Sequence, residues 1–122
     1  LAAKSWFTQP ELTPVLSTAF KRITLVNPAM TERLTIDTHL FFQNFRTGLK
    51  ASLQNAVIIE LKQDGRAASQ MKNILLDHRV KPIRVSKYCV AVTLTAPEVR
   101  TNRFKVKIRR IEKTIGNKLF AI

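Results

Sequence analysis

The first third of the chain alternates apolar and polar positions, a pattern typical of strands with one covered face. Residues 17–26 (STAFKRITLV) predict a first strand. Residues 31–42 (TERLTIDTHLFF) predict a second strand with an apolar back and a polar front. The back comprises Leu34, Ile36, Thr38 and Leu40, and the front comprises Arg33, Thr35, Asp37 and His39. A turn signal at residues 27–29 joins the strands, so residues 17–40 are expected to form a hairpin.

Two further segments have the composition of strands. Residues 56–62 (AVIIELK) predict a buried strand that ends in a turn at Asp64-Gly65. Residues 83–95 (IRVSKYCVAVTLT) are rich in β-branched side chains, so a long strand is expected there. Residues 43–55 are polar and are interrupted by Gly48, which predicts an irregular connection.

Helical spacing occurs in two places. Ser69 is a suitable N-cap for a helix to about Asp77, with Met71, Ile74 and Leu75 facing inward. A last helix ending at Gly116 is favoured by the spacing of Phe104, Ile108, Ile111 and Ile115. The stretch FKVKI at its start also alternates, so a strand is an alternative there. The order β-β-β-α-β-α predicts an α+β fold with a mostly antiparallel sheet and flanking helices.

Composition narrows the classes of partner. The 122 residues suit a single domain, and 21 Lys and Arg against 8 Asp and Glu give a net charge of +13. Such an excess favours an anionic partner: nucleic acid, polyphosphate, a nucleotide or an anionic membrane. A single cysteine excludes a disulfide framework, and we expect a cytoplasmic protein without a transmembrane segment. The chain begins with Leu1, which suggests a fragment of a longer protein.

Charged residues lie within or beside the predicted strands. Glu60 and Lys62 are two residues apart and therefore share a face, which fits either an ordinary ion pair on a solvated sheet or a functional site. The same arrangement recurs at Arg22, Arg33, Arg84 and Lys87. Together these side chains predict a basic concavity that attracts polyanions. A lone carboxylate among cations suits a divalent metal, Mn²⁺ or Mg²⁺, that is also held by phosphate oxygens.

Four segments in order resemble one known family. FKRITLV, ERLTIDTHLFF, VIIELKQ and RVSKYC are similar to the VTC-type polyphosphate polymerase domain of the triphosphate tunnel metalloenzyme superfamily, over residues 17–113. The resemblance implies part of a tunnel-like β-barrel that binds ATP and inorganic polyphosphate. It also implies transfer of the ATP γ-phosphate to a growing polyphosphate chain. The chain resembles the C-terminal half of that domain, so an N-terminal half would come from another segment or chain.

The resemblance also implies roles for individual residues. Glu60 would hold Mn²⁺ or Mg²⁺, and Lys62 would lie beside it on phosphate or orient it. The expected phosphate-binding residues are Arg22, Arg33, Arg84, Ser86 and Lys87. One departure is Phe20, which stands where the family often has a Tyr and lacks the phenolic hydroxyl.

Two other interpretations remain open. A basic half-tunnel could bind polyphosphate, nucleotide or nucleic acid without catalysis, and an inactive remnant would carry the same charge. The seven cations of residues 100–113 (RTNRFKVKIRRIEK) would suit a membrane surface, nucleic acid or simply a solvated helix face. Asp37 shares a face with Arg33, so an internal ion pair is as reasonable for it as an active-site role. Structural roles are expected for His39, His78 and Cys89.

Overall fold

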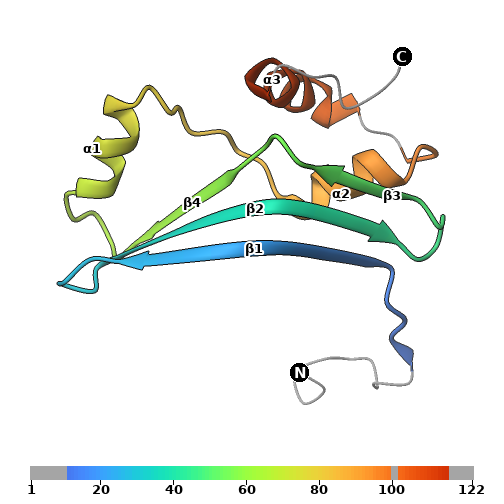
Figure 1. Cartoon of the computed structure of the whole chain (residues 1–122), viewed down its shortest axis with the longest axis horizontal. Coiled ribbons are helices and arrows are strands. Elements are labelled where there is room, and N and C mark those ends of the chain that lie inside the picture. The colour runs from blue at the N-terminus through green and yellow to red at the C-terminus, as the bar shows by residue number, and fades with distance from the viewer. Residues whose placement is uncertain (1–10, 100–101, 116–122) are drawn as a thin grey trace.

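The computed structural model describes residues 11–99 and 102–115, and within them an antiparallel sheet of four strands is accompanied by three α-helices (Figure 1). The strands are β1 (Leu16–Val26), β2 (Glu32–Asn44), β3 (Lys50–Leu53) and β4 (Ile58–Gln63). The helices are α1 (Gln70–Asp77), α2 (Lys87–Thr95) and α3 (Lys105–Ile115), and the 3₁₀ turn Asn102–Phe104 precedes α3. The α+β prediction is confirmed, as is the hairpin of the first two strands.

The long strand β2 is the centre of the sheet. β1 pairs along one edge, while β4 and β3 pair with the two halves of the other edge, at residues 32–37 and 40–43. The outer edges of β1, β3 and β4 pair with no further strand in the part of the chain described. The sheet is therefore not closed into a barrel, and the expected barrel is present at most as an open portion. Three rows of strands are too few to curve back on themselves.

A bulge at His39 turns the second half of β2 over. The register pairs Lys21 with Thr38 but Ala19 with Phe41, so β2 holds one residue more than β1 at this point. His39 has a φ of 53°, the left-handed conformation that such an extra residue adopts. The prediction that Leu40 shares a face with Ile36 is therefore wrong, because a one-residue shift exchanges the two faces. Leu40 instead lies on the face of Asp37.

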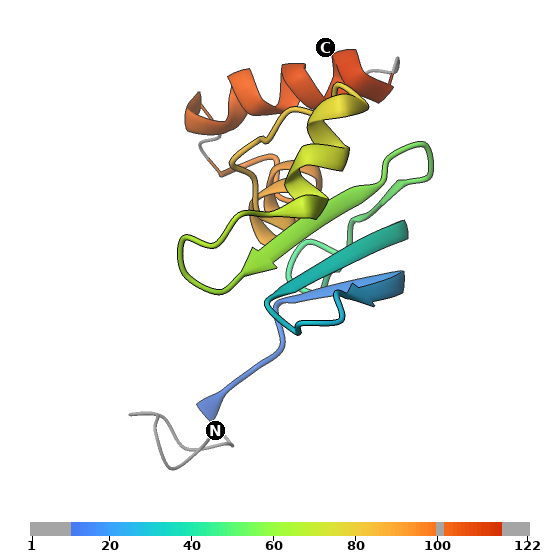
Figure 2. The ribbon, with the colours of Figure 1, turned by 90° about the vertical axis from the view of Figure 1, so that its left-hand side faces the viewer.

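This reversal creates the hydrophobic core. Beyond the bulge, the front face of the sheet carries Leu40, Phe42 and Leu53, which pack with Ala56 and with α2. α2 contributes Val90 and Ala91, and it lies against one face of the sheet, whereas α1 and α3 lie beyond the β3 and β4 edge (Figure 2). The opposite face of the sheet leaves large apolar side chains exposed, among them Ile23, Leu25 and Ile59.

Two sequence predictions for the secondary structure are wrong. The segment expected to be a strand over 83–95 contains α2, because the Ser86 hydroxyl accepts a hydrogen bond from the Cys89 amide and starts a helix there. The β-branched Thr93 and Thr95 are accommodated because their hydroxyls donate to the carbonyls of Cys89 and Ala91. In addition, β3 was missed inside a segment expected to be irregular.

The other helices agree with expectation more closely. Ser69 caps α1 by accepting from the Lys72 amide, and the helix ends at Asp77 as predicted. The predicted inward face of α1 is wrong in part, because Ile74 is exposed while Met71 and Leu75 are half-buried. α3 is helical from Lys105, so the strand alternative for FKVKI is excluded. The expected C-cap at Gly116 lies outside the described residues.

Candidate functional site

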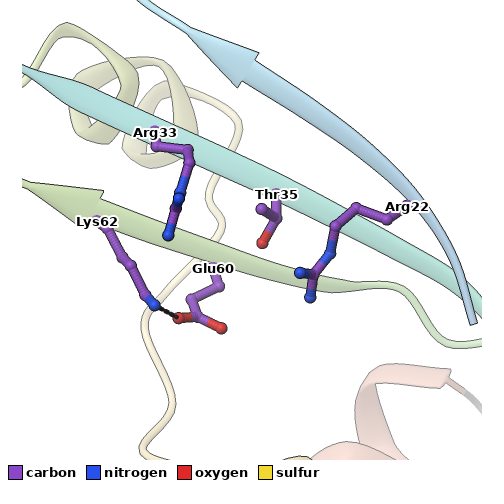
Figure 3. A pocket seen from close by; sticks show the side chains of 5 residues that line it. All are labelled: Arg22, Arg33, Thr35, Glu60 and Lys62. Atoms are coloured by element: carbon purple, nitrogen blue, oxygen red, sulfur yellow. Dashed lines mark ion pairs between the residues drawn. The ribbon is translucent and has the colours of Figure 1, made fainter. Parts of the chain in front are cut away.

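The polar half of the front face forms a small, partly open pocket. It is lined by Arg22 from β1, Arg33 and Thr35 from β2, and Glu60 and Lys62 from β4 (Figure 3). The antiparallel register brings them together, since Thr35 pairs with Glu60 and Arg33 pairs with Lys62. All five side chains project from the same side of the sheet, the side on which α2 covers the core.

The pocket has an excess of positive charge. Three cationic side chains, those of Arg22, Arg33 and Lys62, accompany the single carboxylate of Glu60. Lys62 Nζ lies 3.4 Å from Glu60 Oε1, and both side chains remain largely exposed. Such an exposed ion pair is worth at most about 1 kcal/mol, so it is easily exchanged for a ligand. The ion pair of the first sequence interpretation therefore forms and it faces the pocket, while the functional role of Glu60 and Lys62 stays a prediction.

Beside the pocket, Asp37 is fully buried and doubly bound. Arg22 donates from Nε to Oδ1 at 2.6 Å and from Nη2 to Oδ2 at 2.8 Å, while Lys87 Nζ lies 2.5 Å from Oδ2. The hydrogen bond from Arg22, helped by Lys87, lowers the pKa of Asp37 to about 2. Of the two roles left open for Asp37, the internal ion pair is the one observed, although its cationic partners are Arg22 and Lys87 rather than Arg33.

The two cations that bind Asp37 share a third neighbour. The guanidinium of Arg22 and the ammonium of Lys87 lie 4.7 Å and 5.0 Å from the centre of the Phe20 ring. Both distances are within the range of cation–π attraction. Phe20 therefore acts on the cations through its ring face, a contact that requires no phenolic hydroxyl.

The remaining predicted site residues lie outside the pocket lining. Ser86 is the N-cap of α2, and Arg84 is exposed in the segment that precedes this helix. Lys87 is the first residue of α2 and reaches the pocket only indirectly, through Asp37 and Arg22. Sequence reasoning also overlooked one lining residue, Thr35, whose position between Arg33 and Asp37 on the polar face was the available signal.

The pocket offers one carboxylate for a metal. No group of three or more His, Cys, Asp and Glu side chains that could hold a metal ion occurs within residues 11–99 and 102–115. Glu60 alone is compatible with Mg²⁺ or Mn²⁺, since these ions accept one or two carboxylates and complete their coordination with water and substrate phosphates.

The described helices include none that is long and apolar enough to cross a membrane.

Comparison with known proteins identifies the family of this chain. A family model described as VTC domain matches residues 2–96, and the chain therefore belongs to the VTC domain family, which is part of the polyphosphate polymerase/CYTH-like group. This bears out the resemblance seen in the sequence. No curated protein and no solved structure matches the chain.

Proposed function

We propose that this VTC domain binds the triphosphate of ATP and the end of an inorganic polyphosphate chain, and that it takes part in transferring the γ-phosphate between them. The observation that supports this most is the cluster of Arg22, Arg33 and Lys62 around Glu60 on one open face of the sheet. Membership of the VTC family implies metal-dependent phosphate chemistry, which such a cluster suits.

The proposed roles follow from charge. Arg22, Arg33 and Lys62 neutralise phosphate oxygens, because phosphoryl transfer depends on positioned cations around the transferred group. Glu60 would hold Mg²⁺ or Mn²⁺, which supplies further neutralisation when bound. The terminal oxygen of the polyphosphate chain attacks the γ-phosphorus, the bond between the β–γ bridging oxygen and that phosphorus breaks, and ADP leaves. No nucleophile from the protein is required.

Three residues proposed from the sequence would act around this centre. Lys87 is bonded to Asp37, so we assign it a positioning role in which it fixes Asp37 and thereby Arg22. Arg84 is exposed near the start of α2, and its phosphate-binding role remains a prediction. The hydroxyl of Ser86 already accepts from the Cys89 amide, yet it can still donate its own hydrogen to a phosphate.

The open sheet bears on how the enzyme would be completed. A tunnel requires more strands than residues 11–99 and 102–115 supply, and β1 and β4 each have a free outer edge on which strands can add. We propose that an N-terminal half of the domain, from another segment or another chain, pairs with these edges and adds further phosphate-binding side chains.

The alternative is a basic module that binds polyphosphate, nucleotide or nucleic acid without turnover. The open sheet favours it, because one face is accessible without a closed tunnel. Recognition of single-stranded RNA usually requires aromatic side chains that are free to stack on bases. On the polar face the exposed Phe20 has Arg22 and Lys87 within cation–π distance of its ring, so these cations compete with a base for it, which weighs against RNA.

The test is titration calorimetry of tripolyphosphate into the protein, with and without Mn²⁺, using wild type and Glu60→Ala. Asp64→Ala is a matched control, because it removes an exposed carboxylate just beyond β4 that does not line the pocket. Metal-dependent binding that is lost in Glu60→Ala and kept in Asp64→Ala supports the metal role. Binding that changes neither on removal of the metal nor in Glu60→Ala favours the non-catalytic module. A separate assay of turnover, in which ADP is released from ATP while the polyphosphate chain grows, would establish the enzyme.

A further inference from the structure

One buried polar group among the side chains that line the pocket has no hydrogen-bond partner. Thr35 is only 7% exposed, and its Oγ1 is buried without a hydrogen bond to any described group. Buried hydroxyls almost always find a partner, because leaving one unpaired costs the energy of removing it from water. A threonine kept in this condition on a pocket floor indicates a ligand that supplies the missing hydrogen bond.

The sheet register places Thr35 at the centre of the charged cluster. It lies between Thr24 of β1 and Glu60 of β4, two residues from Arg33 along its own strand. Arg22 pairs with the next residue on the same face, Asp37, so its guanidinium reaches the pocket diagonally from Thr35. In Figure 3 the Thr35 oxygen points into the space between Arg22, Arg33 and Glu60.

The neighbours decide which chemistry suits this hydroxyl. A small anion drawn in by Arg22 and Arg33 can place one oxygen at the pocket floor, where Thr35 is the only uncharged side-chain donor among the described residues that line the pocket. Phosphate oxygens accept hydrogen bonds from hydroxyl groups readily, and ionised acceptors make the stronger ones. We infer that the Thr35 hydroxyl donates a hydrogen bond to a phosphoryl oxygen held between Arg22 and Arg33. This inference rests on the proposed phosphate-binding function and adds a residue to it.

The substitution Thr35→Val tests this assignment because valine keeps the shape of the side chain and removes only the hydroxyl. We expect tripolyphosphate affinity, measured by calorimetry in each buffer in which the wild type binds (with Mn²⁺ or with EDTA), to fall about tenfold, the effect of losing one charge-assisted hydrogen bond. Thr35→Ser keeps the hydroxyl and should therefore retain most of the wild-type affinity. Thr24→Val is the matched control, because Thr24 lies on the same face beside Thr35 but is exposed and does not line the pocket.

Thermal unfolding without ligand provides an independent readout. Removing an unsatisfied buried hydroxyl relieves its desolvation cost, so Thr35→Val should raise the Tm by a few degrees while it weakens binding. If Thr35 were purely structural, Thr35→Val would instead lower both the Tm and the tripolyphosphate affinity, or it would leave the affinity unchanged. Either result overturns the inference.

Two further outcomes separate this inference from the proposed function. If wild type does not bind tripolyphosphate, the proposed function fails and the role of Thr35 fails with it. If wild type binds and Thr35→Val binds equally well in the same buffer, only the inference fails. Where wild type binds both with Mn²⁺ and in EDTA, a loss in Thr35→Val that is confined to the Mn²⁺-containing buffer also overturns it, because the hydroxyl would then act at the metal.

Discussion

Lys87 Nζ lies 2.5 Å from Oδ2 of Asp37, which ties the first residue of α2 to the middle of β2. The same carboxylate receives both hydrogen bonds of Arg22, a residue that lines the pocket. At its other end α2 is held by Asn44 and Thr47, which donate to the hydroxyl and carbonyl of Thr95. The position of Arg22 in the pocket therefore depends on how α2 docks on the sheet.

Asp37→Asn should destabilise the protein strongly. The substitution leaves two cations facing an uncharged buried amide, and breaking a buried ion pair from one side costs about 3–5 kcal/mol. Because Arg22 and Lys87 are partly exposed, we expect a loss of roughly 2–4 kcal/mol in the free energy of unfolding by urea. Glu60→Gln is the control, and its exposed pair should contribute less than about 1 kcal/mol. Equal stability of Asp37→Asn and wild type would contradict the structural role of Asp37.

The contribution of Asp37 should depend on pH in a defined window. The hydrogen bond from Arg22 lowers the pKa of Asp37 from 3.8 to about 2 in the folded protein. Because the folded pKa is the lower one, the stabilisation is complete above pH 4 and is lost as the pH falls toward 2. The difference in unfolding free energy between wild type and Asp37→Asn should accordingly shrink across that interval. A difference that stays constant from pH 5 to pH 2 would argue against a charged Asp37 in the folded state.

Ser86→Ala separates capping from phosphate binding. Loss of the N-cap hydrogen bond to the Cys89 amide should cost about 1 kcal/mol of stability. Ser69→Ala, which removes the N-cap of α1, should cost a similar amount without touching tripolyphosphate affinity. If Ser86 also donates to phosphate, its alanine variant alone should weaken tripolyphosphate binding in calorimetry. Unchanged affinity in both variants would restrict Ser86 to the capping role.

The bulge can be tested through the backbone of His39. Valine tolerates a positive φ poorly, so His39→Val should destabilise the protein by about 1–2 kcal/mol. His39→Gly should be close to neutral, because glycine adopts φ near 53° without strain but loses more chain entropy on folding. Urea unfolding of the two variants gives the comparison. Greater tolerance of valine than of glycine would show that His39 does not hold this conformation.

Binding of phosphate chains should weaken with salt and strengthen with chain length. The pocket cations are solvent-accessible, and screening shortens the range of their field from about 10 Å at 0.1 M salt to about 3 Å at 1 M. Pyrophosphate, tripolyphosphate and longer polyphosphate should bind in increasing order at low salt, as measured by calorimetry. Affinity that is independent of chain length would restrict the site to a single phosphate group.

The strands that could be predicted from the sequence were those in which apolar and polar residues alternate clearly within a single segment. The alternation of residues 17–26 and 31–42 is strong enough to predict β1 and β2, and Ser69 is sufficient to start α1 at the right place. The error over residues 83–95 arises because propensity and packing conflict. The β-branched side chains favour a strand, but Ser86 caps a helix and the covered face of the sheet accepts Val90 and Ala91.

The pocket was predictable from the sequence where it depends only on which residues of a strand share one face of the sheet. Glu60 and Lys62 share a face because they are two residues apart, and the register then brings them to Arg33 and Thr35. The role of Lys87 could not be read in the same way, because its contact with Asp37 joins segments separated by fifty residues of sequence. The missing hydrogen bond of Thr35 likewise exists only in three dimensions.

The extra residue at His39 also limits which length changes β2 can tolerate. Deleting one residue between Asp37 and Leu40 would remove the extra residue and leave Asp37 and Leu40 two positions apart, so that Phe42 would stay on the face of Asp37. Deleting both Thr38 and His39 would instead make Asp37 and Leu40 neighbours on opposite faces, and it would turn Phe42 out into solvent. Among functional homologues a one-residue gap at this point should therefore be tolerated, whereas two-residue gaps should be rare and other length differences should collect in the loops on either side of the strand.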